Sequence, residues 1–219
     1  MDNGILLTDK PAGMTSFGVV ARIRRVLSDQ QGKKVKVGHT GTLDPFATGL
    51  MIIVVGSECK NADKYTKLDK VYEATIRLGE TSTTGDPEGE ISKVSNRVPN
   101  DREVNDVLKK FTGQITQTPP IYSAIKIDGQ RAYKLARKGV EVVMPERKVN
   151  IYSLDLVSYE YPDLNIRAHV SSGTYIRTLA EDIGQTIGTG AYCSQLRRTD
   201  ISDWSVADAK SLSEFGIVS

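Results

Sequence analysis

The chain has 219 residues, of which 39% are hydrophobic and 26% charged, with a formal net charge of +2. This length allows a sizeable core in one large domain or two small ones. No run approaches the roughly 18 to 20 apolar residues that a membrane span needs, and the N-terminus lacks a signal-peptide pattern, so we expect a cytoplasmic protein. Neither the two cysteines, Cys59 and Cys193, nor the two histidines, His39 and His169, have metal-ligand spacing. A disulfide framework and a metal site are therefore not expected.

Basic residues are concentrated in two segments, although the total charge is small. Positions 21–40 contain six basic residues and one acid, and positions 126–148 contain seven basic residues and three acids. Such patches on a near-neutral protein can steer a polyanion without binding every polyanion. Solvated helix faces would give the same pattern, so charge alone does not choose between the two interpretations.

The N-terminal segment predicts a strand followed by a helix. Residues 4–8 form a short apolar run, and the turn DKPAGMTS after them ends in good N-cap residues. The expected helix carries apolar residues at helical spacing: Val19, Ile23, Val26 and Leu27.

The stretch GHTGTLDPFATG, residues 38–49, surrounds one acid, Asp44, with three glycines and three threonines. The run LMIIVVG behind it is short and rich in β-branched residues, which favours a buried strand. Asp44 is therefore predicted in a loop mounted on a central strand, where functional residues are often found. Since Pro45 restricts the backbone of Asp44, the carboxylate should be well ordered.

The rest of the chain alternates between strand and helix patterns. Strands are expected at 71–79, 149–157 and 164–170 because apolar and polar residues alternate there. A helix over 100–113 begins with an Asn100 to Glu103 capping signature, and another runs from about Thr174 to Gly188. This irregular order predicts an α+β fold with a mostly antiparallel central sheet flanked by helices.

Two charged residues stand out from their local patterns. Asp44 before proline is also typical of an ordinary turn cap. Arg177 falls in the first turn of the last helix, where the helix dipole disfavours a cation, so a partly buried carboxylate is expected to hold it. The alternative is a surface arginine paired with Glu181 four residues later. The sequence does not show whether Asp44 and Arg177 meet.

Tyr72 and Tyr175 are the aromatic candidates. Core packing is the commoner fate of such residues. An enzyme that acts on a single base, however, needs an aromatic face for that base to stack on.

Six blocks of the sequence occur in the order and approximate spacing of the bacterial tRNA pseudouridine-55 synthases, the TruB family, which the chain resembles from about Gly4 to Phe215. The blocks are GILLTDKPAGMTS, GHTGTLDPFATGLM, KVYEATIRLG, PPIYSAIKIDGQRAYKLARKGVEV, SSGTYIRTLAEDIG and QLRRTDIS.

The resemblance implies three catalytic residues. Asp44 matches the catalytic aspartate, which acts as the nucleophile when uridine becomes its C-glycoside isomer. Tyr72 matches a tyrosine that stacks on the flipped uracil and assists removal of the C5 proton. Arg177 matches the arginine that pairs with the aspartate.

It also implies five substrate-binding residues. Tyr175 and Leu196 match residues that line the base pocket, and His39 matches a histidine that holds the extruded nucleotides. Lys10 and Lys60 match lysines near the active site.

The family further implies a pseudouridine synthase fold in one catalytic domain over 1–219, with a thumb insertion at about 118–147. The expected partner is the T-arm stem-loop of tRNA, bound by a monomer without guide RNA, membrane, cofactor or metal. We expect the C-terminal PUA domain usual in bacterial relatives to be absent, either because the chain was cut or because this is a short natural form. Ser172 stands where many relatives carry lysine. We expect weaker tRNA binding but an intact catalytic pocket.

The predicted reaction is isomerisation of uridine 55 in the T loop, with the base flipped out before the glycosidic bond is broken. Attack of Asp44 on C6, attack on C1′ and a glycal route all remain open. A non-catalytic tRNA-binding or folding module is the alternative, but it would not need the set Asp44, Tyr72 and Arg177. A glycoside hydrolase would need a second acid, and Asp86 and Glu88 lie in a turn without the features around Asp44.

Overall fold

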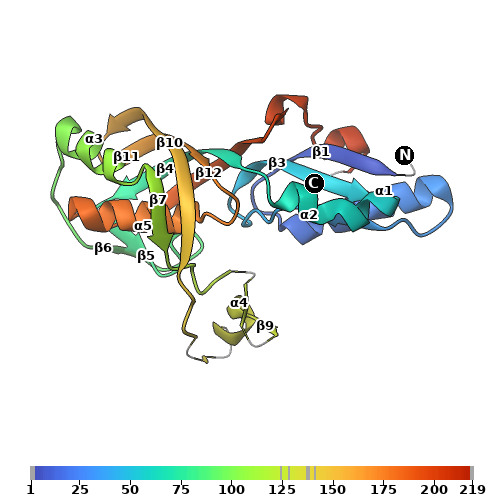
Figure 1. Cartoon of the computed structure of the whole chain (residues 1–219), viewed down its shortest axis with the longest axis horizontal. Helices are drawn as coiled ribbons and strands as arrows, with labels where there is room; N and C mark the ends of the chain where they lie inside the picture. Colours follow the sequence, from blue (N-terminus) through green and yellow to red (C-terminus); the bar gives the residue numbers. More distant parts are fainter. Residues whose placement is uncertain (1–2, 124, 128, 137–138, 141, 218–219) are drawn as a thin grey trace. The chain divides into compact units, whose positions relative to one another are not determined.

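The computed structural model describes residues 3–217 except 124, 128, 137, 138 and 141 (Figure 1). The chain forms two compact units, one of residues 1–73 with 195–219 and one of residues 74–194. Both boundaries fall within strands, β4 (Lys70–Leu78) and β12 (Ala191–Ile201). Within the described residues, no helix is long and apolar enough to cross a membrane.

The sheet of the first unit has the strand order β1-β3-β12-β4. Strand β3 (Thr48–Val55) is buried at every position after the first, as its apolar composition predicts. It pairs antiparallel with β1 (Gly4–Lys10) and β2 (Val37–His39), and parallel with β12. The short strand β13 (Trp204–Ser205) extends β12. Thus β3 is the central support of this unit.

Helix α1 (Ser16–Gln31) follows β1, as predicted. The Thr15 hydroxyl accepts the first free amide, that of Gly18, and the helix ends at Gly32 in the left-handed conformation. Of the predicted apolar stripe, Val19, Ile23 and Leu27 are buried and Val26 is half-buried. The short helices of this unit are η1 (Gly56–Asn61), α2 (Ala62–Thr66), η2 (Val206–Asp208) and η3 (Ser213–Phe215).

The sheet of the second unit continues in the order β12-β4-β11-β10-β7. Strand β10 (Arg147–Glu160) pairs antiparallel with β11 (Asp163–Val170) and with β7 (Gly113–Gln117). The apolar residues of β11 are all buried, as the alternation predicts. Strands β5 (Glu80–Ser82) and β6 (Ile91–Lys93) form a separate hairpin.

The two longer helices among the described residues of the second unit are α3 (Asp101–Lys110) and α5 (Ile176–Ile187). Helix α3 begins with the predicted capping box, in which Asn100 and Glu103 satisfy each other's backbone amides. Helix α5 ends at Gly188 in the left-handed conformation, where the sequence predicts its end. Together with the sheet, these helices confirm the predicted α+β class.

The predicted insertion at 118–147 leaves the unit from the ends of β7 and β10 (Figure 1). It contains β8 (Lys126–Ile127), β9 (Gln130–Arg131) and α4 (Ala132–Ala136). Residues 124, 128, 137, 138 and 141 of this segment lie outside the described residues.

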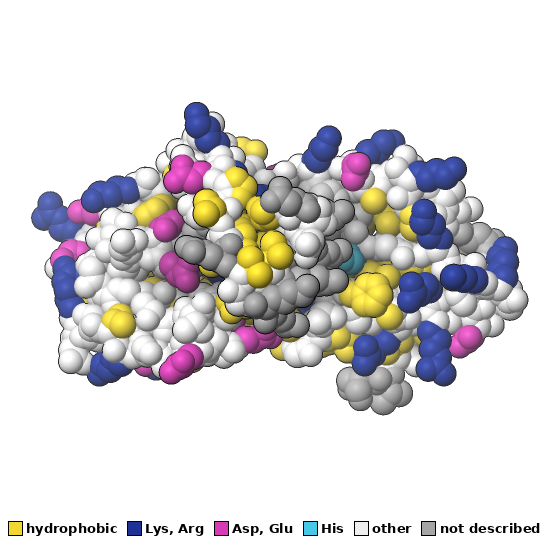
Figure 2. Space-filling view, turned by 90° about the horizontal axis from the view of Figure 1, so that it is seen from below, with side chains coloured by type: hydrophobic (Ala, Val, Ile, Leu, Met, Phe, Trp, Pro, Cys, Tyr) yellow, Lys and Arg dark blue, Asp and Glu magenta, His cyan; other side chains and the backbone are white. Residues whose placement is uncertain are grey.

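The first basic segment lies on α1 and the loop after it. Its exposed basic residues are Arg22, Arg25, Lys33, Lys34 and Lys36. Dark blue side chains are gathered at the right of Figure 2, the end at which α1 is drawn in Figure 1. This surface is available to a polyanion, as the charge pattern suggests.

Candidate active site

Asp44 lies in the loop between β2 and β3 and is half-buried. Its own carbonyl accepts the amide of Ala47 at 3.2 Å, which closes a tight turn around Pro45. The two residues beside Asp44 are each fixed by groups from elsewhere in the chain, as described next.

Leu43, before Asp44, is fixed by the start of α1. The Ser16 hydroxyl accepts the Leu43 amide at 2.8 Å and donates to the Leu43 carbonyl at 2.9 Å. Both residues are buried, so these bonds are shielded from water. Leu43 therefore cannot shift without breaking two buried hydrogen bonds.

Pro45, after Asp44, is fixed by the end of β1. The Lys10 side chain is fully buried, and its ammonium donates to the carbonyls of Pro11 at 2.8 Å, Met14 at 2.7 Å and Pro45 at 3.1 Å. The amide of Gly13 donates to the same Pro45 carbonyl at 2.8 Å. Lys10 thus uses all three of its donors on backbone oxygens around the Asp44 loop.

The other sequence candidates of the first unit lie on neighbouring elements. Tyr72 on β4 and Leu196 on β12 are each 8% exposed, and these two strands are neighbours in the sheet. His39 ends β2 opposite Ile53 of β3, and Lys60 is exposed on η1.

Arg177, in the first turn of α5, is 3% exposed and pairs with a carboxylate of its own unit, that of Asp86, at 3.2 Å. Its guanidinium also donates to the carbonyl of Thr84 at 2.7 Å and to that of Tyr122 at 3.0 Å. The expectation that a carboxylate offsets the unfavourable helix dipole is confirmed. The partner Asp86 lies in the turn between β5 and β6.

Asp86 was not predicted as a site residue. It is 4% exposed, and its carboxylate accepts the Thr84 hydroxyl at 2.6 Å and the Glu88 amide at 3.0 Å. These donors orient the carboxylate before it meets the guanidinium. One sequence signal points to it: Asp86 precedes proline among threonines and glycines, just as Asp44 does.

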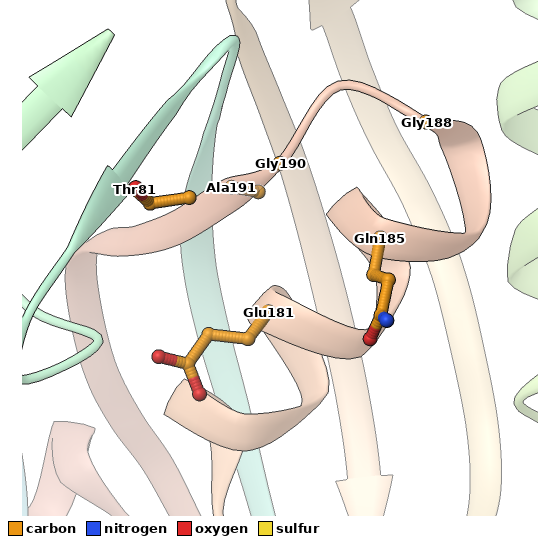
Figure 3. A pocket seen from close by; sticks show the side chains of 6 residues that line it. All are labelled: Thr81, Glu181, Gln185, Gly188, Gly190 and Ala191. Atoms are coloured by element: carbon orange, nitrogen blue, oxygen red, sulfur yellow. The ribbon is translucent and has the colours of Figure 1, made fainter. Parts of the chain in front are cut away.

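A pocket of about 480 Å³ lies beside this ion pair, lined by Thr81, Glu181, Gln185, Gly188, Gly190 and Ala191 (Figure 3). Figure 3 shows the Glu181 and Gln185 side chains extending from α5. Burial raises the pKa of Glu181, while the charge of Arg177 acts in the opposite direction. A Cβ on Gly85 would lie only 2.7 Å from the Glu181 carboxylate, so this turn and α5 pack closely.

Tyr175 immediately precedes α5 and is held by its backbone. The buried Gln117 amide accepts from the Tyr175 amide at 3.0 Å and donates to its carbonyl at 3.1 Å. The Arg147 guanidinium lies 5.2 Å from the centre of the Tyr175 ring, a cation–π distance. Gln117 was not predicted, and no local signal marks it.

The candidate residues are divided between the two units. His39, Asp44, Tyr72 and Leu196 belong to the first, as do Lys10 and Lys60, while Tyr175 and Arg177 belong to the second. The pairing of Asp44 with Arg177 stays a prediction.

Comparison with known families gives one match over most of the chain. The model described as "TruB family pseudouridylate synthase (N terminal domain)" matches residues 24–176. A protein of Clostridium kluyveri named tRNA pseudouridine synthase B is 41% identical over 210 residues, which cover 96% of this chain and 71% of the relative. A protein of the same name from Azoarcus sp. is 44% identical over 211 residues, covering 96% and 68%.

Solved structures with a similar fold come from larger assemblies. The structure titled "Crystal Structure of a Cbf5-Nop10-Gar1 Complex" contains a chain with a TM-score of 0.73 and 29% identity. The match covers 96% of the present chain and 52% of the solved one. The present chain therefore spans about half the length of that protein.

Proposed function

This chain belongs to the TruB family of pseudouridylate synthases, and on that premise we propose that it converts the T-loop uridine at position 55 of tRNA to pseudouridine. The curated relatives that it matches are named for action on tRNA. We further propose that it acts on the T-arm stem-loop as a stand-alone cytoplasmic enzyme without guide RNA.

One observation carries the proposal: Asp44 is half-buried between two immobilised neighbours. Leu43 and Pro45 together make four hydrogen bonds: the Ser16 hydroxyl bonds the amide and the carbonyl of Leu43, and Lys10 and Gly13 both donate to the carbonyl of Pro45. A carboxylate on so fixed a backbone suits a nucleophile that must meet one carbon atom.

In the proposed reaction the uridine first leaves the stacked loop, at a cost of a few kcal/mol that stacking on Tyr72 offsets. Asp44 then attacks C6 or C1′, or promotes loss of the base through a glycal. The uracil turns so that C5 faces C1′, the carbon–carbon bond forms, the C5 proton leaves, and N1, which has lost its bond to C1′, takes up a proton. The reaction is an isomerisation, so atoms balance without a co-reactant.

We propose that Arg177 acts as the counter-charge of the nucleophile and that Asp86 orients Arg177. The buried ion pair at 3.2 Å supports the second of these roles. Tyr175 and Leu196 would line the base pocket, and His39, Lys10 and Lys60 would act around it.

The test is a single-turnover assay on a T-arm stem-loop labelled with tritium at uridine C5. The control is the same RNA without uridine at the target position. Tritium release from the first RNA alone supports the proposal and its site. If neither this RNA nor full-length tRNA releases tritium although both are bound, the chain is an RNA-binding module instead.

A further inference from the structure

Arg198 on β12 is one of the largest fully buried side chains in the protein, at 1% exposure. Its Nε donates to the carbonyl of Leu50 at 2.7 Å, and its Nη2 donates to the carbonyl of Gly41 at 3.2 Å. These two carbonyls lie on opposite sides of Asp44 in the sequence. One guanidinium therefore joins the entry and the exit of the Asp44 loop.

We propose that Arg198 is a positioning residue for the reaction, acting by holding both ends of the loop that carries Asp44. This inference rests on the proposed function, because it assigns Asp44 the nucleophilic role.

The charge of Arg198 is not used in an ion pair. Among the residues that the structure describes, no carboxylate lies within salt-bridge distance of it. The nearby ammonium of Lys70 is also buried and donates to the carbonyls of Thr66 and Leu68. Burying a cation without a counter-ion is costly, so a neutral side chain would be favoured here if packing were the only requirement.

The backbone around Arg198 is built for close approach. A Cβ on Gly49, whose φ is +108°, would lie 2.2 Å from the Arg198 carbonyl oxygen and 2.7 Å from its amide nitrogen. Only glycine fits there. A Cβ on Gly41 would lie 3.5 Å from a guanidinium nitrogen. Gly49 thus lets the backbone of β3 lie close to that of Arg198, whereas a Cβ at position 41 would make only an ordinary van der Waals contact.

The geometry requires arginine rather than lysine. The planar guanidinium presents several donors at fixed angles and can reach two carbonyls at once. A lysine at this position keeps the charge but has all its donors on one nitrogen atom, whereas the bonds to Leu50 and Gly41 leave from two nitrogen atoms of the guanidinium. Arg198→Lys therefore keeps the positive charge while removing the simultaneous hydrogen bonds to the carbonyls of Leu50 and Gly41.

The matched control is Arg197→Lys, one residue earlier on the same strand. Arg197 is 40% exposed and pairs with Asp9 at 2.7 Å. Two kinds of measurement are made on both variants. The first is the single-turnover rate with saturating T-arm RNA, together with the Kd for that RNA. The second is amide hydrogen exchange of peptides covering residues 38–50 and 101–110.

For Arg198→Lys we expect a rate about 100-fold lower, the effect of misplacing a reacting group by about 1 Å, with Kd changed by less than about 3-fold. Exchange should rise in 38–50 and stay unchanged in 101–110. Arg197 also donates to the Thr48 hydroxyl at 3.3 Å, so for Arg197→Lys the expected result is an unchanged rate and unchanged exchange in 101–110. A rate within about 3-fold of the parent overturns the proposal. So does exchange that rises equally in both peptides, because that is general destabilisation.

If Arg198→Lys does not fold, both readouts are taken on Arg198→Gln, which can still donate to one carbonyl without carrying a charge. The same two results overturn the proposal for that variant. Hydrogen exchange can be measured on an inactive protein. If the parent protein forms no pseudouridine, the proposed function is refuted, but exchange in 38–50 still tests whether Arg198 holds the Asp44 loop.

Discussion

The two units hold their candidate residues in opposite ways. In the first, buried cations bind backbone: Lys10 and Arg198 donate to carbonyls around Asp44, and the acid itself stays half-buried. In the second, a buried cation is the candidate group, and the carboxylate of Asp86 holds it at 3.2 Å. The first arrangement fixes the position of a loop, and the second neutralises a charge.

The difference predicts different failures. Removing a cation from the first unit leaves carbonyls without a donor and lets the loop that carries Asp44 move, so we expect the position of Asp44 to be affected first. Removing the carboxylate from the second takes a close counter-charge away from a buried cation, so we expect the free energy of unfolding to fall first. The following changes test that contrast.

The largest effect is expected from Asp44→Asn, which keeps the size of the side chain and removes its charge. Turnover should fall by at least about 1000-fold, because a neutral amide is a poor nucleophile. Tritium release measures this, and T-arm RNA binding should be retained. Residual turnover above about one part in a thousand would remove Asp44 from the nucleophilic role.

Asp86→Asn should destabilise the protein by about 3 to 5 kcal/mol, because it removes the carboxylate that lies 3.2 Å from the buried guanidinium of Arg177. Urea unfolding measures the change. The control is the double variant with Arg177→Gln, which should recover part of the loss since neither charge then remains. If the double variant is as unstable as the sum of the two single ones, the pair is not coupled.

Lys10→Met should cost about 1 to 3 kcal/mol, because the carbonyls of Pro11 and Met14 lose this donor and the carbonyl of Pro45 keeps only the Gly13 amide. Lys67→Met is the matched control. Because Lys67 is exposed, this variant should unfold at the same urea concentration as the parent. Equal midpoints for all three proteins would contradict the structural role of Lys10.

Local features of this fold were predictable from sequence. The Asn100 to Glu103 capping box, the β-branched run of β3 and the end of α5 at Gly188 depend on residues close together in the chain. The position of Arg177 against the helix dipole even predicted that a carboxylate would hold it.

The partners across the fold were not predictable in the same way. Asp86 and Arg177 meet only because the β5–β6 turn packs on α5, and Arg198 reaches Gly41 across 157 positions of sequence. No periodicity or local propensity records such contacts. The repeated Asp-Pro dipeptide at 44 and 86 was the one available hint, and it marks a turn rather than a partner.

The smallest effect concerns Lys70, the second buried cation beside Arg198. Burial, together with the nearby charge of Arg198, lowers its pKa to about 8. The unfolded chain, with an ordinary lysine pKa, binds more protons between pH 8 and 10.5, so this group makes the protein more stable as pH rises. From pH 7 to pH 9 its contribution should increase by about 1.4 kcal/mol. Urea unfolding of the parent and of Lys70→Met is measured at pH 7 and pH 9. The contribution of Lys70 is the difference between the two proteins in how much the free energy of unfolding changes between these pH values. Identical slopes would show that the ammonium of Lys70 is not destabilised by its surroundings, and the first unit would then hold one strained cation, Arg198, rather than two.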